Sequence, residues 1–183
     1  MIHTGTKIIK TSRLILRPFD FGDCSDMLKN WITNPKVQFE YGEPIYTTKP
    51  EVDRLLEEWI NNYTNSDFYR WAIIEKESNK NIGQIAFCRV YTELRIAEIE
   101  YCIGESFWGN GYALEALMAI IDFTFKETEF LKLEAYHRVE NIKSAKVLIK
   151  SAMHTTNNVQ RFIIENTEPH GEICYCITRD EMI

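Results

Sequence analysis

The chain has 183 residues, 45% of them hydrophobic, which is enough for one globular domain with a sizeable buried core. We expect a single domain over residues 1–183, with its folded core between residues 11 and 180. A formal net charge of −6 argues against a surface that binds nucleic acid or an anionic membrane. No apolar run approaches the ~18 residues that cross a bilayer. We therefore expect neither a nucleic-acid nor a membrane partner.

Five cysteines are scattered along the chain, and none belongs to a C-x-x-C pair. Such a distribution is typical of reduced thiols in the cytoplasm rather than of a disulfide framework. The four histidines stand at no spacing known for metal ligands. The sequence therefore predicts a cytoplasmic protein that binds no metal.

The first part of the chain predicts one strand and two helices. Residues 11–18 alternate polar and apolar side chains and stop at a proline, which indicates a short strand. Residues 20–31 have apolar side chains at helical spacing, and Pro35 ends this helix. Residues 39–48 contain glycine, proline and two tyrosines, and they predict a loop. Residues 49–62 carry an apolar stripe and predict the second helix.

The middle part predicts three strands and then a helix. Residues 69–75 and 82–90 are strand-like runs joined by a polar turn, so they predict a hairpin. Residues 96–103 are rich in isoleucine and predict a third strand. Residues 112–126 are apolar almost all around a helix, which indicates a helix buried between the sheet and its neighbours.

The last part predicts a strand at residues 131–137, a helix that begins after Asn141, and a closing hairpin formed by residues 159–164 and 173–178. Asn141 is a good N-cap by residue type. The full order is strand, two helices, three strands, helix, strand, helix and a strand pair. This order predicts an α+β fold, in which helices flank a mostly antiparallel sheet that contains one βαβ step.

Two glycines, Gly109 and Gly111, stand between the third strand and the buried helix. Glycine lets the backbone approach a ligand closely, and the first turn of a helix carries unpaired N–H groups with a partial positive charge. Such a turn suits a phosphate or pyrophosphate. The turn does not end in Lys-Ser or Lys-Thr, which argues against a P-loop, and Leu114 replaces the third glycine of a dinucleotide fingerprint. A plain strand-to-helix turn is the alternative.

The residues of this turn resemble a known motif. Residues 108–113 read W-G-N-G-Y-A and are similar to the acetyl-CoA pyrophosphate loop of the GNAT N-acetyltransferases. Gly111 and Ala113 match the last two anchors of that loop. Trp108 stands in place of the usual Gln or Arg, as is common in the RimJ/RimL-like (ribosomal-protein N-terminal acetyltransferase-like) branch.

Two further motifs resemble the same branch. Residues 11–18 read T-S-R-L-I-L-R-P, which is similar to its T-x-R-L-x-L-R-P opening. Asn141 and Ser144 match its N-x-x-S motif, although Ala152-Met153 stands where Gly-Phe is usual. The resemblance covers nearly the whole chain and implies the GNAT fold.

The resemblance also implies where acetyl-CoA binds. The N–H groups of the glycine turn are expected to hold the pyrophosphate, and the backbone of Cys102 and Ile103 is expected to pair with the pantetheine amides as an added strand does. The side chains of Asn141 and Ser144 are expected to face the coenzyme arm. The predicted cofactor-binding residues are Cys102, Ile103, Trp108, Gly109, Asn110, Gly111, Tyr112, Ala113, Asn141 and Ser144.

Glu98 and Glu100 lie two residues apart in one strand, so both carboxylates face the same side. Glu98 matches the Glu of the family's E-x-G-Y pattern, and it is predicted to act as the base through a water. Glu100 replaces the Gly of that pattern, and it is predicted to bind a cationic acceptor. The alternative is a solvated strand face that pairs with Arg89 or Arg95.

Ser144 is the predicted acid, because the serine of N-x-x-S lies near the sulfur in the family. Support of the helix cap is its alternative role, and Tyr136 and His137 are the runners-up as acid. Tyr41 lies in the loop that borders the acceptor site in the family, and it is predicted to bind substrate. Its alternative role is to cover the core.

The chain is thus predicted to be an N-acetyltransferase that moves the acetyl group of acetyl-CoA to a primary amine by direct attack. A protein or peptide N-terminus is the expected acceptor, because an α-amine with a pKa of about 7.7 to 8.0 is easier to deprotonate than lysine at about 10.4. Ribosomal proteins are one source of such a terminus. A small amine such as a polyamine, an amine-bearing antibiotic and a non-catalytic acyl-CoA-binding module are the alternatives. The expected assembly is a monomer or a homodimer.

Overall fold

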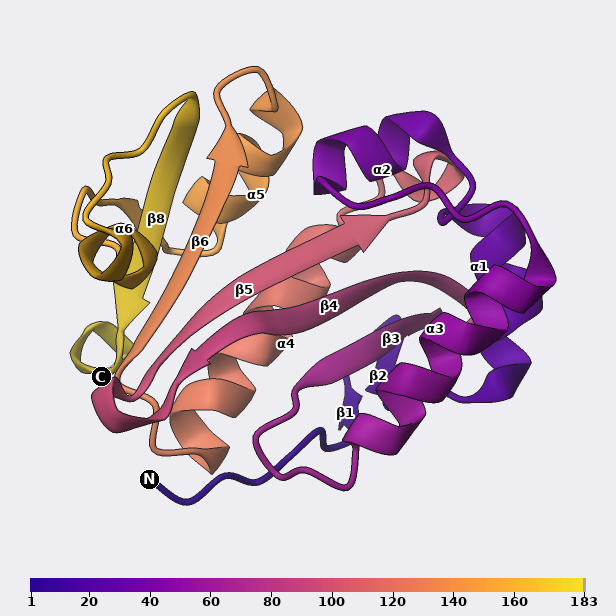
Figure 1. Cartoon of the computed structure of the whole chain (residues 1–183), viewed down its shortest axis with the longest axis horizontal. Helices are drawn as coiled ribbons and strands as arrows, with labels where there is room; N and C mark the ends of the chain where they lie inside the picture. Colours follow the sequence, from indigo (N-terminus) through magenta and orange to yellow (C-terminus); the bar gives the residue numbers. More distant parts are fainter. Residues whose placement is uncertain (183) are drawn as a thin grey trace.

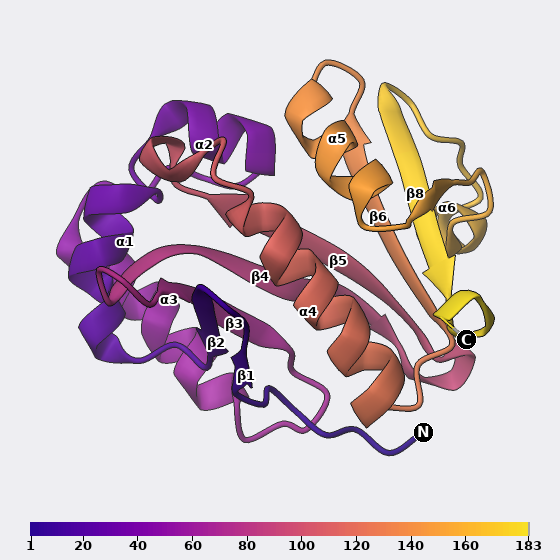
Figure 2. The ribbon, with the colours of Figure 1, turned by 180° about the vertical axis from the view of Figure 1, so that it is seen from behind.

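The computed structural model describes residues 1–182, which form one eight-stranded sheet with helices on both faces (Figures 1 and 2). The strands are β1 (Ile9–Lys10), β2 (Leu14–Arg17), β3 (Arg70–Glu75), β4 (Lys80–Tyr91), β5 (Ile96–Ile103), β6 (Lys132–Arg138), β7 (His154–Thr155) and β8 (Glu172–Thr178). The helices are α1 (Cys24–Asn30), α2 (Pro35–Tyr41), α3 (Lys49–Asn62), α4 (Tyr112–Glu127), α5 (Ile142–Lys150) and α6 (Gln160–Glu165).

The strands follow the order β1–β2–β3–β4–β5–β6–β8–β7 across the sheet. Each neighbouring pair is antiparallel except β5 and β6, which are parallel. Helix α4 connects these two parallel strands and forms the predicted βαβ step. The mixed fold with a mostly antiparallel sheet is therefore confirmed.

The helices divide between the two faces of the sheet. Helices α4 and α5 cover the face seen in Figure 2, and α1 and α3 cover the opposite face seen in Figure 1. The side chains of β5 alternate between these layers: Ile99 and Ile103 pack in the cluster with α4, and Cys102 packs in the cluster with α1 and α3. Each face of the central strands is therefore buried.

Several predicted elements have the expected positions. Strand β5 and helix α3 have the predicted bounds, and α4 extends one residue beyond its predicted end. The buried face of α4 includes Leu117, Ile120 and Ile121, which are at most 1% exposed. A helix with apolar residues on most sides is buried, because both the sheet and its neighbours must cover it.

The prediction of a loop at residues 39–48 is wrong for its first part. Helix α2 begins at Pro35, and Asn34 caps it by accepting hydrogen bonds from the next two available N–H groups. Proline lacks an N–H donor, so it fits the first position of a helix as well as it ends the preceding one. Gly42 ends α2 with a left-handed φ of 83°. Tyr41 is therefore the last residue of a helix.

The prediction of a strand at residues 159–164 is also wrong. Residues 160–165 form α6, whose first N–H donates to the buried carboxylate of Glu134 on β6. A short apolar run has no periodicity that separates strand from helix. Strand β8 pairs instead with the two-residue strand β7 and with β6.

Three properties of residues 1–182 bear on what the chain binds. The five cysteines are free thiols. Among the described helices, none combines the length and the apolar character needed to cross a bilayer. The described side chains of His, Cys, Asp and Glu form no group of three or more placed to hold a metal ion.

Candidate active site

The sheet opens between its two parallel strands. Strands β5 and β6 are paired only from Ile96 to Glu98, whereas β4 remains paired with β5 as far as Ile103. Strand β6 turns away with β8, and the two halves of the sheet diverge in Figures 1 and 2. The end of β5 therefore has an edge with no neighbouring strand.

The alternation of backbone groups along β5 decides which residues face this opening. The N–H of Gly104 donates to Ile82 O on β4, at 2.8 Å. Because hydrogen-bonded pairs alternate along an antiparallel ladder, the backbone of Cys102 then faces β4, and the backbones of Tyr101 and Ile103 face the opening. Of the predicted pair Cys102 and Ile103, only Ile103 thus presents its backbone to the opening, and Tyr101 takes the place of Cys102.

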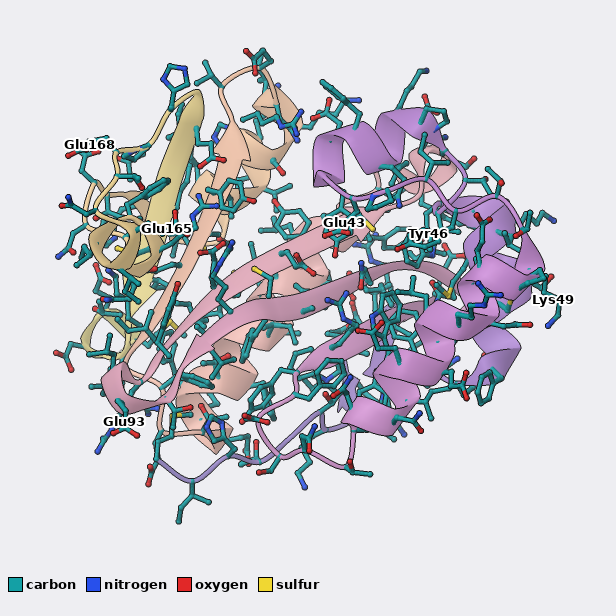
Figure 3. The ribbon with its side chains drawn as sticks, viewed as in Figure 1. Glu43, Tyr46, Lys49, Glu93, Glu165 and Glu168 are labelled. Atoms are coloured by element: carbon teal, nitrogen blue, oxygen red, sulfur yellow. The ribbon has the colours of Figure 1, made fainter. Side chains whose placement is uncertain are left out.

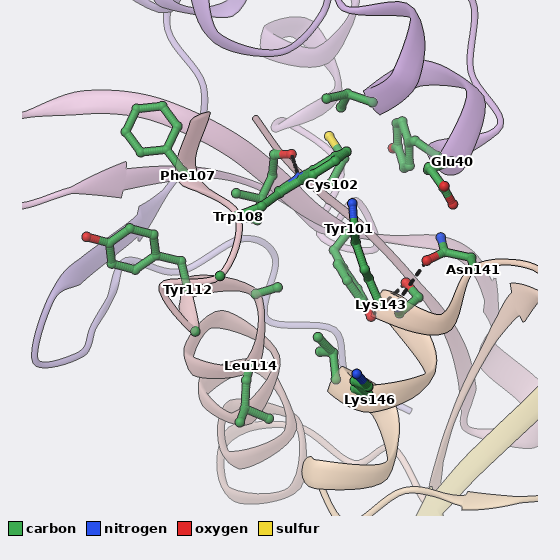
Figure 4. Close-up of a pocket in the computed structure, with 18 of the residues that line it drawn as sticks. Glu40, Tyr101, Cys102, Phe107, Trp108, Tyr112, Leu114, Asn141, Lys143 and Lys146 are labelled. Atoms are coloured by element: carbon green, nitrogen blue, oxygen red, sulfur yellow. Dashed lines mark hydrogen bonds between the residues drawn. The ribbon is translucent and has the colours of Figure 1, made fainter. Parts of the chain in front are cut away.

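A cavity of about 320 Å³ lies at this opening (Figure 4). Its walls come from α2, the end of β5, the glycine turn, the start of α4, and α5. Ten of the residues predicted to bind cofactor or substrate line it: Tyr41, Cys102, Ile103, Trp108, Gly109, Gly111, Tyr112, Ala113, Asn141 and Ser144. Asn110, Glu98 and Glu100 do not line it. Sequence positions far apart therefore meet at one cavity.

The glycine turn has the backbone geometry that the sequence predicts. Gly109 and Gly111 have φ values of 82° and 80°, in the left-handed region that favours glycine. Gly111 is the N-cap of α4, and no side chain makes the usual cap hydrogen bond there. The first N–H groups of α4 thus remain available at the cavity wall with the positive end of the helix dipole behind them.

Two side-chain hydrogen bonds hold this turn, and the first of them fastens it to the end of β5. The indole Nε1 of Trp108 donates to Ile103 O at 2.7 Å. The side chain of Asn110 donates to Phe107 O, so Asn110 closes the turn from outside the cavity. Trp108 occupies a position where the related motif usually has Gln or Arg. Its indole N–H links the turn before α4 to the end of β5.

A second anchor joins the turn to the segment before β2. The guanidinium of Arg13 donates to Asn110 O at 2.8 Å, pairs with Glu115 at 2.7 Å, and stacks on the ring of Tyr112. The carboxylate of Glu115 also accepts hydrogen bonds from Thr11 and Ser12. The glycine turn is therefore held both by the end of β5 and by the segment before β2.

Helix α5 brings positive charge to the cavity. Lys143, Lys146 and Lys150 are spaced so that they share one face of the helix, and all three line the cavity. The ammonium of Lys143 lies 3.7 Å from the centre of the Trp108 ring (Figure 4). Glu40 is the one carboxylate among the described lining residues. The cavity is thus positively charged in a chain that is acidic as a whole.

The N-x-x-S motif begins this helix. The side chain of Asn141 accepts the N–H of Ser144 at 3.0 Å, as predicted for an N-cap. The hydroxyl of Ser144 lies 3.1 Å from the phenol oxygen of Tyr101 on β5. Burial raises the pKa of Tyr101 to about 12, so the phenol keeps its proton at neutral pH. Two hydroxyls from opposite sides of the opening therefore meet inside the cavity.

Glu100 and Tyr41, both predicted to bind substrate, contact each other. The phenol of Tyr41 donates to Glu100 Oε1 at 2.6 Å and accepts from Gln84 Nε2. Arg70 donates to Glu100 at 2.9 Å and also to Gln84, which closes a ring of four side chains. This ring lies on the β5 face opposite α4, beside the cavity at Tyr41.

Glu98, the predicted base, is buried at the point where β5 and β6 separate. It is 1% exposed and forms a 2.7 Å ion pair with Arg89, which is the partner named in the alternative interpretation. The pairing depends on a register shift at Cys88 that sets Arg89 opposite Glu98. Burial raises the pKa of the Glu98 carboxyl, and the charges of Arg89 and Arg161 oppose this rise. Its role as a base stays a prediction.

The runners-up as acid lie elsewhere. His137 is buried, with one ring nitrogen at Arg138 O and the other at the phenol of Tyr175. The ring of Tyr136 stacks under the guanidinium of Arg161. Neither residue lines the cavity.

A profile of the acetyltransferase (GNAT) domain matches residues 13–154. This range covers most of the chain and contains the opening, the glycine turn and α5. The chain belongs to the GNAT acetyltransferase family. The resemblance drawn from the sequence motifs is therefore confirmed.

Two bacterial proteins named as N-acetyltransferases are similar to most of the chain. The uncharacterized N-acetyltransferase p20 of Bacillus licheniformis is 32% identical over 139 residues, which are 75% of this chain and 77% of that protein. The uncharacterized N-acetyltransferase YoaA of Bacillus subtilis is 24% identical over 172 residues, or 94% and 97% of the two chains.

Two solved structures share the GNAT fold. An acetyltransferase from Bacillus anthracis has a TM-score of 0.78 at 24% identity, over 96% of this chain and 100% of that one. RimL, the ribosomal L7/L12 alpha-N-protein acetyltransferase solved with coenzyme A, has a TM-score of 0.79 at 20% identity, over 96% and 99%. At these identities the likeness shows the fold, and it is consistent with the RimJ/RimL-like branch.

Some site residues were not found from the sequence. Tyr101 is the Tyr of the E-x-G-Y pattern, so its signal was present although no role was given to it. The spacing of Lys143, Lys146 and Lys150 on a predicted helix was a second usable signal. Arg13 belongs to the T-x-R-L motif, but its contact with Asn110 depends on folding and has no local signal.

Proposed function

We propose that this GNAT-family chain transfers the acetyl group of acetyl-CoA to the α-amine of a peptide or protein N-terminus. One observation carries the proposal: three features line the same cavity. They are the start of α4 with its available N–H groups, a wall with three lysines, and a pair of hydroxyls. Acetylation of a small amine is the alternative within the same chemistry.

The residues present fit coenzyme A. The left-handed glycines at the start of α4 form a cradle suited to a pyrophosphate, because N–H groups and the helix dipole both favour an anion there. Lys143, Lys146 and Lys150 supply cations for the phosphates along the neighbouring wall. The edge of β5 at Tyr101 and Ile103 is not paired with β6 and offers backbone groups for the pantetheine amides, although Ile103 O already accepts from Trp108. The chain thus offers partners for both the phosphates and the pantetheine amides of coenzyme A.

When bound, acetyl-CoA supplies a thioester whose carbonyl carbon accepts a nucleophile. The chain needs to supply little base for an α-amine, because its pKa of about 7.7 to 8.0 leaves a sizeable neutral fraction near neutral pH. Such a low demand for a base fits this site, because Glu98, the predicted base, already forms an ion pair with Arg89. The acetyl transfer then depends mainly on how the residues position the two reactants.

Tyr101 and Ser144 serve the sulfur side of the reaction. The phenol of Tyr101, with a pKa of about 12, is a weaker acid than a thiol at about 8.5. Tyr101 therefore stabilises developing charge on sulfur by donating a hydrogen bond, directly or through Ser144, while it keeps its own proton. The amine would lose one proton and the sulfur would gain one, so the hydroxyls of Tyr101 and Ser144 would be protonated after the reaction as they were before it.

The test is an acceptor assay with a matched peptide pair. The protein and acetyl-CoA are incubated with a peptide that has a free N-terminus, and with the same peptide carrying an N-terminal acetyl group. We expect thiol release and a mass gain of one acetyl group with the free peptide alone. Binding of coenzyme A without transfer to any peptide or small amine would contradict the proposal and favour a non-catalytic acyl-CoA-binding module.

A further inference from the structure

A second cavity, of about 260 Å³, lies beside Tyr41. Tyr41 lines both cavities. The second is lined by the two residues that follow α1, by parts of α2, α3, β3 and β4, and by the segment between α2 and α3, where Figure 3 labels Glu43 and Tyr46. Its volume is several times the about 30 Å³ that one water occupies, so it has room for a side chain.

The mouth of this cavity is acidic. Glu43 and Glu58 line it and are exposed, and neither carboxylate forms an ion pair or a hydrogen bond with another described side chain. Burial and the nearby charge of Glu100 raise the pKa of Glu43, and the charge of Arg70 opposes this rise. Two carboxylates that form no ion pair, at an aromatic-walled cavity, favour a positively charged guest.

A residue that lines the same cavity has a buried acceptor atom. Gln38 is 2% exposed, and its Nε2 donates to Pro44 O, which fixes the orientation of the amide. Its Oε1 is buried and has no hydrogen-bond partner among the described residues. An unpaired buried oxygen costs free energy that a donor from a ligand recovers. Gln38 lines the cavity, so a donor such as an ammonium would be placed between the oxygen and the carboxylates.

Arg70 is a cation that lines this cavity, and it already has partners. Arg70 lines the cavity, but its terminal nitrogens donate to Glu100 and Gln84, and its guanidinium stacks on the ring of Trp59 at 4.5 Å. Its charge is therefore balanced by Glu100. Its Nε, however, is buried and without a partner among the described residues. This N–H would pair with a carbonyl oxygen, which a peptide has and a simple polyamine lacks.

We propose that the second cavity binds a basic side chain of the acceptor peptide, with its alkylammonium at Glu43, Glu58 and Gln38 Oε1 and a peptide carbonyl at Arg70 Nε. This inference rests on the proposed function, because it treats the acceptor as a peptide. It gives the enzyme a preference for N-termini that carry a lysine within the first few residues.

The test compares peptides that differ by one charge. Three peptides carry lysine at position 1, 2 or 3, and three matched peptides carry norleucine there, which keeps the alkyl chain and removes the ammonium. We expect at least one lysine peptide to have a kcat/KM about tenfold higher than its norleucine partner, as hydrogen bonds to charged groups imply. Glu43→Gln and Glu58→Gln should each reduce this ratio. Glu57→Gln, an equal charge change at an exposed neighbour outside the cavity, should keep it.

A second arm separates the peptide from a small amine. The same assay compares 1,5-diaminopentane with pentylamine. Discrimination between these amines, without discrimination in any peptide pair, would overturn the peptide assignment. Equal kcat/KM for lysine and norleucine at all three positions, or an equal loss with Glu57→Gln, would overturn the cation site itself.

Calorimetric binding of the N-acetylated lysine and norleucine peptides to the protein with coenzyme A gives a readout that needs no turnover. Tighter binding of the lysine peptides, lost in Glu58→Gln, supports the inference even when no peptide is acetylated, a result that would overturn the proposed function alone. Acetylation without any charge preference, and equal binding of both peptides, would overturn the inference and leave the proposed function intact.

Discussion

The two edges of β5 are built for different purposes. Toward β4 the strand is paired from Ile96 to Ile103, and the backbones approach so closely that a Cβ on Gly83 would lie 2.1 Å from Cys102 O. Toward β6 the pairing stops at Glu98, and the remaining edge faces a cavity. One edge thus gives the strand its rigidity, and the other gives the protein a binding site. A chain can leave hydrogen bonds unmade on one side of a strand because the other side fixes its position.

The largest expected effect is that of Gly83→Ala in β4, at the edge where β4 and β5 are paired. The new Cβ would meet backbone atoms, which cannot move aside as a flexible side chain can, so we expect a loss of about 3 kcal/mol in the free energy of unfolding. Urea denaturation measures this loss. Gly109→Ala is the control, because a Cβ there meets nothing within 4 Å and only the positive φ is strained. Equal losses in the two variants would contradict the close approach of β4 and β5.

On the open edge, Tyr101→Phe should affect turnover rather than folding. Loss of the phenol that contacts Ser144 removes a hydrogen-bond donor from the sulfur side, and we expect kcat to fall about a hundredfold. Steady-state kinetics and the affinity for coenzyme A, which should hardly change, check this. The matched control is Tyr175→Phe, which removes another buried phenol that contacts His137 and lies outside the cavity. An unchanged kcat in Tyr101→Phe would remove the role given to this residue.

At the helix mouth, Gly111→Val should weaken coenzyme A binding about tenfold, because a β-branched residue resists the left-handed conformation and shifts the N–H groups. Calorimetry with coenzyme A measures the change. Gly171→Val is the control: its φ is 71°, and a Cβ there meets nothing within 4 Å. It should cost similar stability and leave the affinity unchanged. A similar loss of affinity in both variants would contradict the binding of coenzyme A at the glycine turn.

The smallest effect concerns the anchor between Arg13 and Glu115. Burial would raise the pKa of Glu115, but hydrogen bonds from Thr11, Arg13 and Ser12 lower it from 4.5 to about 2. A lowered folded pKa stabilises the protein above the ordinary pKa, and this stability is lost as the pH falls from about 5 toward 2. Because the site is partly exposed, we expect about 1 kcal/mol. Urea denaturation at pH 7 and pH 3 should show a smaller difference for Glu115→Gln than for the unchanged protein, and an equal difference would contradict the anchor.

The sequence predicted the elements whose signals are local. The isoleucine-rich strand β5, the capped and striped helix α3 and the glycine turn each carry their pattern within a few residues. Helix α2 was missed because a proline stops one helix and starts another with the same chemistry. Helix α6 was predicted as a strand because a six-residue segment with four apolar residues fits both periods, and its contact with Glu134 is long-range.

The candidate site was predicted in its composition more than in its geometry. The motifs indicated the glycine turn, Asn141 and Ser144, and these line one cavity. The sequence did not reveal which backbone groups of Tyr101, Cys102 and Ile103 face the opening, since that depends on the register with β4. Nor did it reveal that Glu98 is buried, because burial depends on the distant parts of the chain that pack around β5.

The gap between β5 and β6 gives the sheet two inner borders in addition to its outer ones. Unpaired strand borders usually attract strands from other chains and promote aggregation. Here Ile103, whose backbone faces the gap, is only 6% exposed, and the flanking helices α2, α4 and α5 line the space beside it. A flexible ligand arm can enter that space from the cavity, but the side chains of a whole neighbouring strand would meet helices. The fold thereby keeps its unpaired backbone for a small guest and protects it from self-association.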